Sequence, residues 1–237
     1  MPMQFYRRLN PIKAISFDLD DTLYDNKPII IAAELAQFDY IKKHVSQAET
    51  TTCQQWVEYR FDLLKKQPQL RHDMTLLRSH AIEQQLLSLG VNQVDAKRHS
   101  LKAFDAFYQQ RNQIVVAPSV LDTLAGLANK YPLIAITNGN ADIHAFGLDK
   151  YFEFALLSGQ NGMAQKPSRQ MFDIGCDKLG IKTQNLLHIG DSLYSDVGGA
   201  INANAMAGWI NDVQAPLTNK SSLPHFEFST IEQLSDF

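Results

Sequence analysis

Three carboxylates follow an apolar tetrapeptide near the start of this 237-residue chain, in the run Asp18-Leu19-Asp20-Asp21-Thr22. Neighbouring residues of an extended chain point to opposite faces, so Asp18 and Asp20 can share one face while Leu19 packs on the other. One such carboxylate can attack phosphorus while the other transfers protons. Carboxylates at the mouth of a buried strand are costly without a cation, and oxygen ligands suit Mg²⁺. The alternative is an acidic turn in which Asp21 or Thr22 caps a helix.

Groups that could hold a phosphate occur further along the chain. Thr137 and Asn138, followed by Gly139, offer a hydroxyl, an amide and backbone N–H groups. The same tripeptide is also a common turn. Lys166, just before Pro167, could place an ammonium group in the same site or could simply be solvated.

A second acidic segment contains Asp191, within Gly190-Asp191-Ser192, and Asp196. Asp191 could complete a metal site, and Asp196 could hold Lys166 in place. Alternatively, Asp196 is a favourable charge in the first turn of a helix. The four groups of residues occur in order after successive apolar runs, which favours a function over four coincidences.

Short apolar runs precede most of these polar groups. They span residues 14–17, 133–136, 186–189 and 205–210, with a weaker run at 154–157. Helical patterns fit residues 119–130, 169–179 and 195–204. Continuous apolar runs separated by helices predict an α/β fold with a parallel sheet covered on both faces. Such sheets bind ligands at the carboxyl ends of their strands, where the polar groups lie.

The stretch from residue 27 to residue 112 breaks this alternation. Apolar residues recur there at helical spacing, as in Leu35, Phe38 and Ile41. Pro68 and Gly90 mark the clearest breaks between the expected helices. We therefore expect an all-helical insertion of about four helices. After the polar residues 218–222, residues 226–228 predict a short strand that returns to the sheet edge.

Composition excludes several classes of protein. A formal net charge of -3 gives no bulk reason to expect nucleic-acid binding. Cys53 and Cys176 lack the spacing of a zinc site or a disulfide framework, which favours a reducing cytoplasm. No apolar segment suggests a signal peptide or approaches the roughly 20 residues of a membrane span. No GxxxxGK[ST] run predicts a nucleotide-driven motor. We expect a small-molecule partner, with no nucleic acid and no membrane; the oligomeric state is left open.

The combined motifs resemble the haloacid dehalogenase superfamily. The resemblance rests on Asp18-x-Asp20-x-Thr22, Thr137-Asn138, Lys166 and Gly190-Asp191-x-x-x-x-Asp196. It implies a Rossmann-like core, residues 1–26 and 113–237, and a helical cap, residues 27–112, of the type inserted between the first two motifs.

The resemblance also implies a role for each motif residue. Asp18 would be the nucleophile that forms an aspartyl-phosphate, and Asp20 the general acid and base. Thr137, Asn138 and Lys166 would bind phosphate, and Asp196 would orient Lys166. Asp18, Asp20 (through its backbone carbonyl) and Asp191 would bind Mg²⁺. Members that cleave carbon–halogen bonds usually lack the second aspartate, so Asp20 favours phosphate chemistry.

Longer stretches are similar to bacterial flavin-pathway phosphatases, a subgroup that acts on 5-amino-6-(5-phospho-D-ribitylamino)uracil and can hydrolyse FMN. They are residues 17–26, 135–141 and 196–200, with a cap segment around residues 72–75. This resemblance implies a role in riboflavin metabolism. A broad sugar-phosphate or nucleotide phosphatase, or a non-catalytic binding protein on this scaffold, are the alternatives.

Substrate contacts are predicted in the cap. The candidates are Arg71, His72, Asp73 and Arg78. Their alternative is an ordinary charged helix surface. Trp56 and Tyr59 could stack on a ring, although core packing is favoured, and His188 is assigned to the buried sheet and not to a metal.

Overall fold

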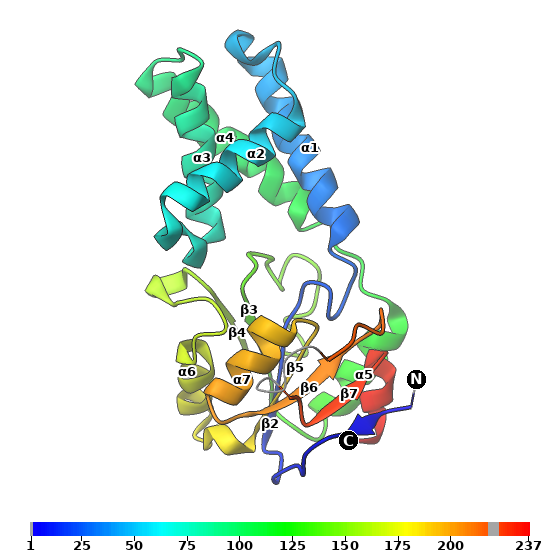
Figure 1. Ribbon diagram of the computed structural model, residues 1–237. Coiled ribbons are helices and arrows are strands. Elements are labelled where there is room, and N and C mark those ends of the chain that lie inside the picture. The colour runs from blue at the N-terminus through cyan, green and yellow to red at the C-terminus, as the bar shows by residue number, and fades with distance from the viewer. Residues whose placement is uncertain (1, 218–222) are drawn as a thin grey trace. The chain divides into compact units, whose positions relative to one another are not determined.

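The computed structural model describes residues 2–217 and 223–237 (Figure 1). The chain divides into two compact units. One, which we call the core unit, comprises Met1–Asp25 and Val115–Phe237; the other, the helical unit, is Asn26–Ile114. The polar stretch 218–222 noted in the sequence lies outside the described residues.

The core unit is built on a seven-stranded sheet in the order β1-β7-β6-β5-β2-β3-β4. The strands are β1 Gln4–Phe5, β2 Ala14–Phe17, β3 Leu133–Thr137, β4 Phe154–Leu157, β5 Leu186–Gly190, β6 Met206–Ile210 and β7 Phe226–Phe228. All neighbours are parallel except β1, which runs antiparallel to β7. The predicted α/β class and the five apolar runs predicted to be strands are confirmed.

Helices cover both faces of this sheet, which explains why its central strands β2, β3 and β5 are buried throughout and mostly apolar. On one face, Phe172 of α6 (Gln170–Leu179) and Ala200 of α7 (Gly198–Asn202) pack against residues of β2 to β6. On the other face lie α5 (Pro118–Ala128) and the C-terminal 3₁₀ turn Ile231–Asp236 (Figure 1).

Two details differ from the sequence prediction. The helix predicted over 195–204 is divided into a π-helical turn, Leu193–Val197, and the short α7. The strand at Phe226–Phe228 forms as predicted, but β1 pairs outside it, so β7 is not the edge. A two-residue strand is too short to leave a periodic signal in the sequence.

The helical unit contains α1 Lys27–His44, α2 Cys53–Lys66, α3 Met74–Ser88 and α4 Gln93–Arg111, with 3₁₀ turns at Ser46–Ala48 and Pro68–His72. Side-chain caps set the starts of three of these helices: Thr52 for α2, Asp73 for α3 and Asn92 for α4. Trp56 packs in the helical core, as favoured above. None of the described helices has the length and apolar character that a membrane crossing requires.

Candidate active site

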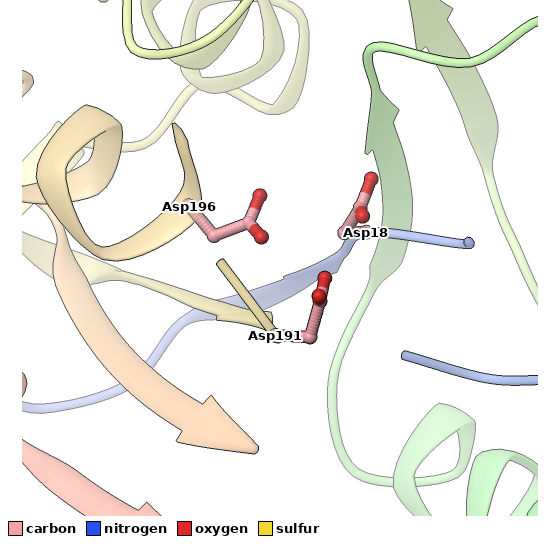
Figure 2. A group of neighbouring side chains, drawn as sticks. All are labelled: Asp18, Asp191 and Asp196. Carbon is pink, nitrogen blue, oxygen red and sulfur yellow. The ribbon is translucent and has the colours of Figure 1, made fainter. Parts of the chain in front are cut away.

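The carboxyl ends of three adjacent strands bring the predicted residues together. Phe17, the last residue of β2, lies opposite Ala135 of β3 and Ile189 of β5. Asp18 and Asp191 therefore emerge at one edge of the sheet. Figure 2 shows these two side chains converging with Asp196, and one oxygen from each lies within 4.8 Å of the others.

Lys166 is buried among these carboxylates. Its Nζ donates to Asp18 Oδ1 at 2.8 Å and lies 2.6 Å from Asp196 Oδ1. It also donates to the carbonyl oxygen of Ile136. Burial lowers the pKa of Lys166, but the attraction of the two carboxylates outweighs burial and raises the pKa overall. The ammonium thus remains charged next to Asp18.

Asn138 has both ends of its side chain engaged with Lys166. Its Oδ1 accepts from the Lys166 backbone N–H at 2.7 Å, and its Nδ2 donates to the Lys166 carbonyl at 3.0 Å. We predicted Asn138 as a phosphate-binding residue. Both polar groups of its side chain bind the Lys166 backbone, so a phosphate contact would have to come from the Asn138 backbone.

Both carboxylate oxygens of Asp196 have partners in the structure. It accepts from the Ser192 backbone N–H at 2.9 Å, and His188 Nε2 lies 3.3 Å from its Oδ1. Burial opposes the charge, but Lys166 and His188 hold the pKa of Asp196 well below its usual range. Because both oxygens already serve these partners, we assign Asp196 to Lys166 and not to a metal.

His188 lies in the buried sheet, as predicted, and additionally supports Asp196. Burial lowers the pKa of His188 to about 4, so its ring is neutral at pH 7. An ionised Asp196 can only accept, so His188 Nε2 carries the proton. Nδ1 then accepts from the hydroxyl of Ser16 at 2.8 Å.

The remaining carboxylates suit a hard divalent cation. Burial raises the pKa of Asp18 to about 7 despite the opposing charge of Lys166, and it raises the pKa of Asp191 to about 6. The charge of Asp196 adds to both increases. Lys166 alone therefore does not balance this cluster. A cation beside Asp18 and Asp191 would offset the penalty, and carboxylate oxygens are the donors that Mg²⁺ prefers.

Asp20 and Thr137 border the same edge. Thr137 is buried, and its Oγ1 accepts from the Gly139 backbone N–H at 2.9 Å. Asp20 accepts from the Tyr24 hydroxyl at 2.8 Å. A Cβ added at Gly139 would lie 2.4 Å from Asp20 Oδ2, so only glycine admits this carboxylate.

Gly139→Ala is expected to lower kcat/KM for a phosphate ester about 100-fold, because it displaces the Asp20 carboxylate by a distance on the order of 1 Å. The free energy of unfolding should change little, since the obstructing atom is the end of a movable side chain. Gly126→Ala in α5, whose Cβ meets nothing within 4 Å, is the matched control and should keep full activity. Equal kinetics for the two variants would contradict this placement of Asp20.

The predicted substrate-contact residues of the helical unit have local partners there. Arg71 Nε donates to the Pro68 carbonyl, and Asp73 caps α3 through the Leu76 N–H. Arg78 is buried over the Phe107 ring, 3.6 Å from its centroid. Arg78 also donates to Glu34 and Gln37, and His72 is half-buried. Their role in substrate binding stays a prediction.

Sequence reasoning gave no role to Tyr24, considered Gly139 only for its backbone N–H beside a phosphate, and gave His188 only a packing role. Each acts on a predicted residue: Tyr24 and Gly139 on Asp20, His188 on Asp196. Tyr24 lies four residues after Asp20, inside a stretch that resembles flavin-pathway phosphatases. That proximity was the one available signal.

Comparison with known proteins agrees with this geometry. Residues 12–204 match the model of the haloacid dehalogenase-like hydrolase family. The chain is 37% identical over 236 residues to the 5-amino-6-(5-phospho-D-ribitylamino)uracil phosphatase YigB of Escherichia coli (strain K12), covering 98% of this chain and 99% of that protein. It is 26% identical to the N-acylneuraminate-9-phosphatase of Mus musculus, covering 95% and 93%.

Solved structures show the same fold. A structure named 2-haloacid dehalogenase, from Pseudomonas syringae pv. Tomato DC3000, has a TM-score of 0.88 at 32% identity, covering 95% of this chain and 97% of that one. The hydrolase YfnB of Bacillus subtilis, described as bound to magnesium, has a TM-score of 0.68 at 19% identity, with coverages of 96% and 98%. The predicted resemblance and the predicted phosphatase class are confirmed.

Proposed function

We propose that this chain, which belongs to the haloacid dehalogenase-like hydrolase family, is a Mg²⁺-dependent phosphomonoester hydrolase with Asp18 as its nucleophile. The observation that carries the proposal is the buried ion triad in which Lys166 bridges Asp18 and Asp196. A buried charge network of this kind is costly to fold, and it has a use where negative charge develops on a phosphoryl group.

The first chemical step forms an aspartyl-phosphate. A carboxylate oxygen of Asp18 attacks phosphorus, and the ester P–O bond breaks with its electron pair going to the leaving oxygen. Asp20 gives that oxygen its proton, so an alcohol departs. Lys166 and the hydroxyl of Thr137 stabilise the charge on the non-bridging oxygens.

The second step returns the enzyme to its starting state. A water oxygen attacks phosphorus while Asp20 accepts the water's proton. The bond between phosphorus and the Asp18 oxygen breaks, which restores the carboxylate and releases inorganic phosphate. The two displacements therefore account for both residues: Asp18 is the nucleophile, and Asp20 carries out both proton transfers.

Mg²⁺ would be held by the side chains of Asp18 and Asp191 and by the backbone carbonyl of Asp20. When bound, it supplies positive charge beside the transferring phosphoryl group. The raised pKa values of Asp18 and Asp191 support this assignment, since both carboxylates would be stabilised by the cation.

We propose 5-amino-6-(5-phospho-D-ribitylamino)uracil, with FMN as a further ester, as the substrate. The support is the name of the Escherichia coli relative, which is similar over nearly the whole of both chains. We further propose that the helical unit is a cap that selects the ester, with Arg71, His72, Asp73 and Arg78 as the candidate contacts.

Dehalogenation is the competing activity, because the Pseudomonas structure is named a 2-haloacid dehalogenase. Its chemistry differs at the leaving group. A halide departs without a proton, whereas the alkoxide of a phosphate ester needs one. A proton donor at the position of Asp20, which lies against Gly139, is needed for the leaving group only in the second case.

A substrate panel tests the proposal. Phosphate release would be measured for the ribitylaminouracil phosphate, FMN, UMP, glucose 6-phosphate and N-acylneuraminate 9-phosphate, and chloride release for 2-chloropropionate, each with Mg²⁺ and with EDTA. We expect kcat/KM for the first two esters to exceed that for glucose 6-phosphate by about 10-fold or more. Of the panel, only these two combine a pyrimidine-dione ring with a ribityl chain. EDTA should abolish release from every ester.

Other outcomes identify the alternatives. Similar kcat/KM values across all esters would indicate a broad phosphatase. Binding of FMN without phosphate release would indicate a non-catalytic protein, and chloride release would indicate a dehalogenase. Release that persists in EDTA would contradict the metal requirement.

A further inference from the structure

The chain makes one tight turn directly after β2, the strand that leads to Asp18. The Leu23 N–H donates to the Leu19 carbonyl at 2.9 Å, and Asp21 adopts a left-handed backbone with φ of 57°. Asp tolerates this conformation better than most residues. The turn brings Tyr24 alongside Asp20, and the two form an isolated parallel β-bridge.

The Tyr24 side chain is fixed at both ends. Its hydroxyl donates to Asp20 Oδ1 at 2.8 Å. Its ring meets the ring of Phe146 edge-on, with centroids 5.8 Å apart and planes at 82°. The phenol is therefore aimed at one oxygen of Asp20 by ring packing and not by the hydrogen bond alone.

The other oxygen of Asp20 has a different neighbour. Oδ2 occupies the space that a Cβ of Gly139 would fill, against the loop that begins at Thr137. Tyr24 on one side and Gly139 on the other thus determine which carboxylate oxygen faces this loop. Because Oδ1 accepts from Tyr24, a proton on the carboxyl group resides on Oδ2.

We propose that Tyr24 is a positioning residue for proton transfer: it anchors Asp20 Oδ1 so that Oδ2 delivers the proton to the leaving oxygen. This inference rests on the proposed phosphatase function. Tyr24 acts through Asp20 and does not itself touch the substrate. A residue that only stabilised the turn would affect all esters equally, whereas a positioning residue affects those that depend on protonation.

The test is a series of aryl phosphates whose phenols range from acidic to weakly acidic, assayed with Mg²⁺. The quantity compared is kcat/KM, which reports the step that expels the phenol. For Tyr24→Phe we expect about a 10-fold fall with the poorest leaving group and less than about a 2-fold fall with the best, because only the former needs a proton. The dependence of kcat/KM on the pKa of the leaving phenol should therefore become steeper. We expect the same change, to a larger extent, for Asp20→Asn.

Two comparisons isolate the effect. Tyr6→Phe removes an equivalent hydrogen bond, from Tyr6 to Glu227 Oε2 at 2.7 Å beside β7, and should leave the dependence unchanged. In an Asp20→Asn background, Tyr24→Phe should have no further effect on kcat/KM. Thermal unfolding of each variant shows that it is folded.

The outcomes separate this inference from the proposed function. A wild-type protein that hydrolyses none of the esters refutes the phosphatase. If the wild-type enzyme is active but Tyr24→Phe lowers kcat/KM equally for every ester, or for none, only the proposed role of Tyr24 is overturned. A further loss in the Asp20→Asn background would also overturn it.

Discussion

Asp18→Asn is expected to lower Mg²⁺-dependent phosphate release by about 10⁴-fold or more, because an amide cannot form the acyl-phosphate bond through a charged oxygen. Release from FMN measures the loss. Acid-quenched wild-type protein should carry a phosphoryl adduct by intact mass, and the variant should carry none. The variant should also lose the increase in Tm that Mg²⁺ gives the wild type, since it lacks one of two carboxylate ligands.

Loss of folding would not explain this result. Burial raises the pKa of Asp18 to about 7, above its value in the unfolded chain, so its ionised form destabilises the folded protein at pH 8. A neutral asparagine removes that penalty, and Tm at pH 8 without Mg²⁺ should not fall. Asp177→Asn, at an exposed position in α6, is the control and should keep its activity. Phosphate release by Asp18→Asn at the wild-type rate would disprove the nucleophile.

The central strands could be predicted because parallel strands buried on both faces appear in the sequence as nearly continuous apolar runs. The same holds for Asp18, Asn138 and Asp191, each of which directly follows a strand in the sequence. Because β2 and β5 are parallel neighbours, Asp18 and Asp191 must reach the same end of the sheet. Local patterns combined with one rule of topology therefore predict most of the site.

The contacts that support the site depend on register between distant segments. Asn138 meets Lys166 across 28 residues, and Ser16 meets His188 across 172. No local pattern carries such information, so the sequence predicts a phosphate contact for Asn138 but not its contact with Lys166. Arg78 shows the same limit in the helical unit: a charged residue at a helical position reads as surface until its partners, Glu34 and Phe107, are known.

Lys166→Met is expected to lower kcat/KM by about 10²- to 10³-fold, because it removes the cation that would face the non-bridging oxygens. It also leaves Asp18 and Asp196 buried without their shared partner. Breaking a buried ion pair on one side costs roughly 3–5 kcal/mol, so chemical denaturation without Mg²⁺ should show a lower free energy of unfolding. Lys182→Met, at an exposed position, is the control for both measurements.

Mg²⁺ separates the two effects of Lys166→Met. A cation bound by Asp18 and Asp191 can replace part of the missing charge, so saturating Mg²⁺ should restore stability more in the variant than in the wild type. It should not restore kcat/KM, because Mg²⁺ held by Asp18 and Asp191 would not supply the charge of an ammonium at the position of Lys166. A folded Lys166→Met protein with wild-type kcat/KM would show that the buried triad is structural, and the proposed function would lose the observation on which it rests.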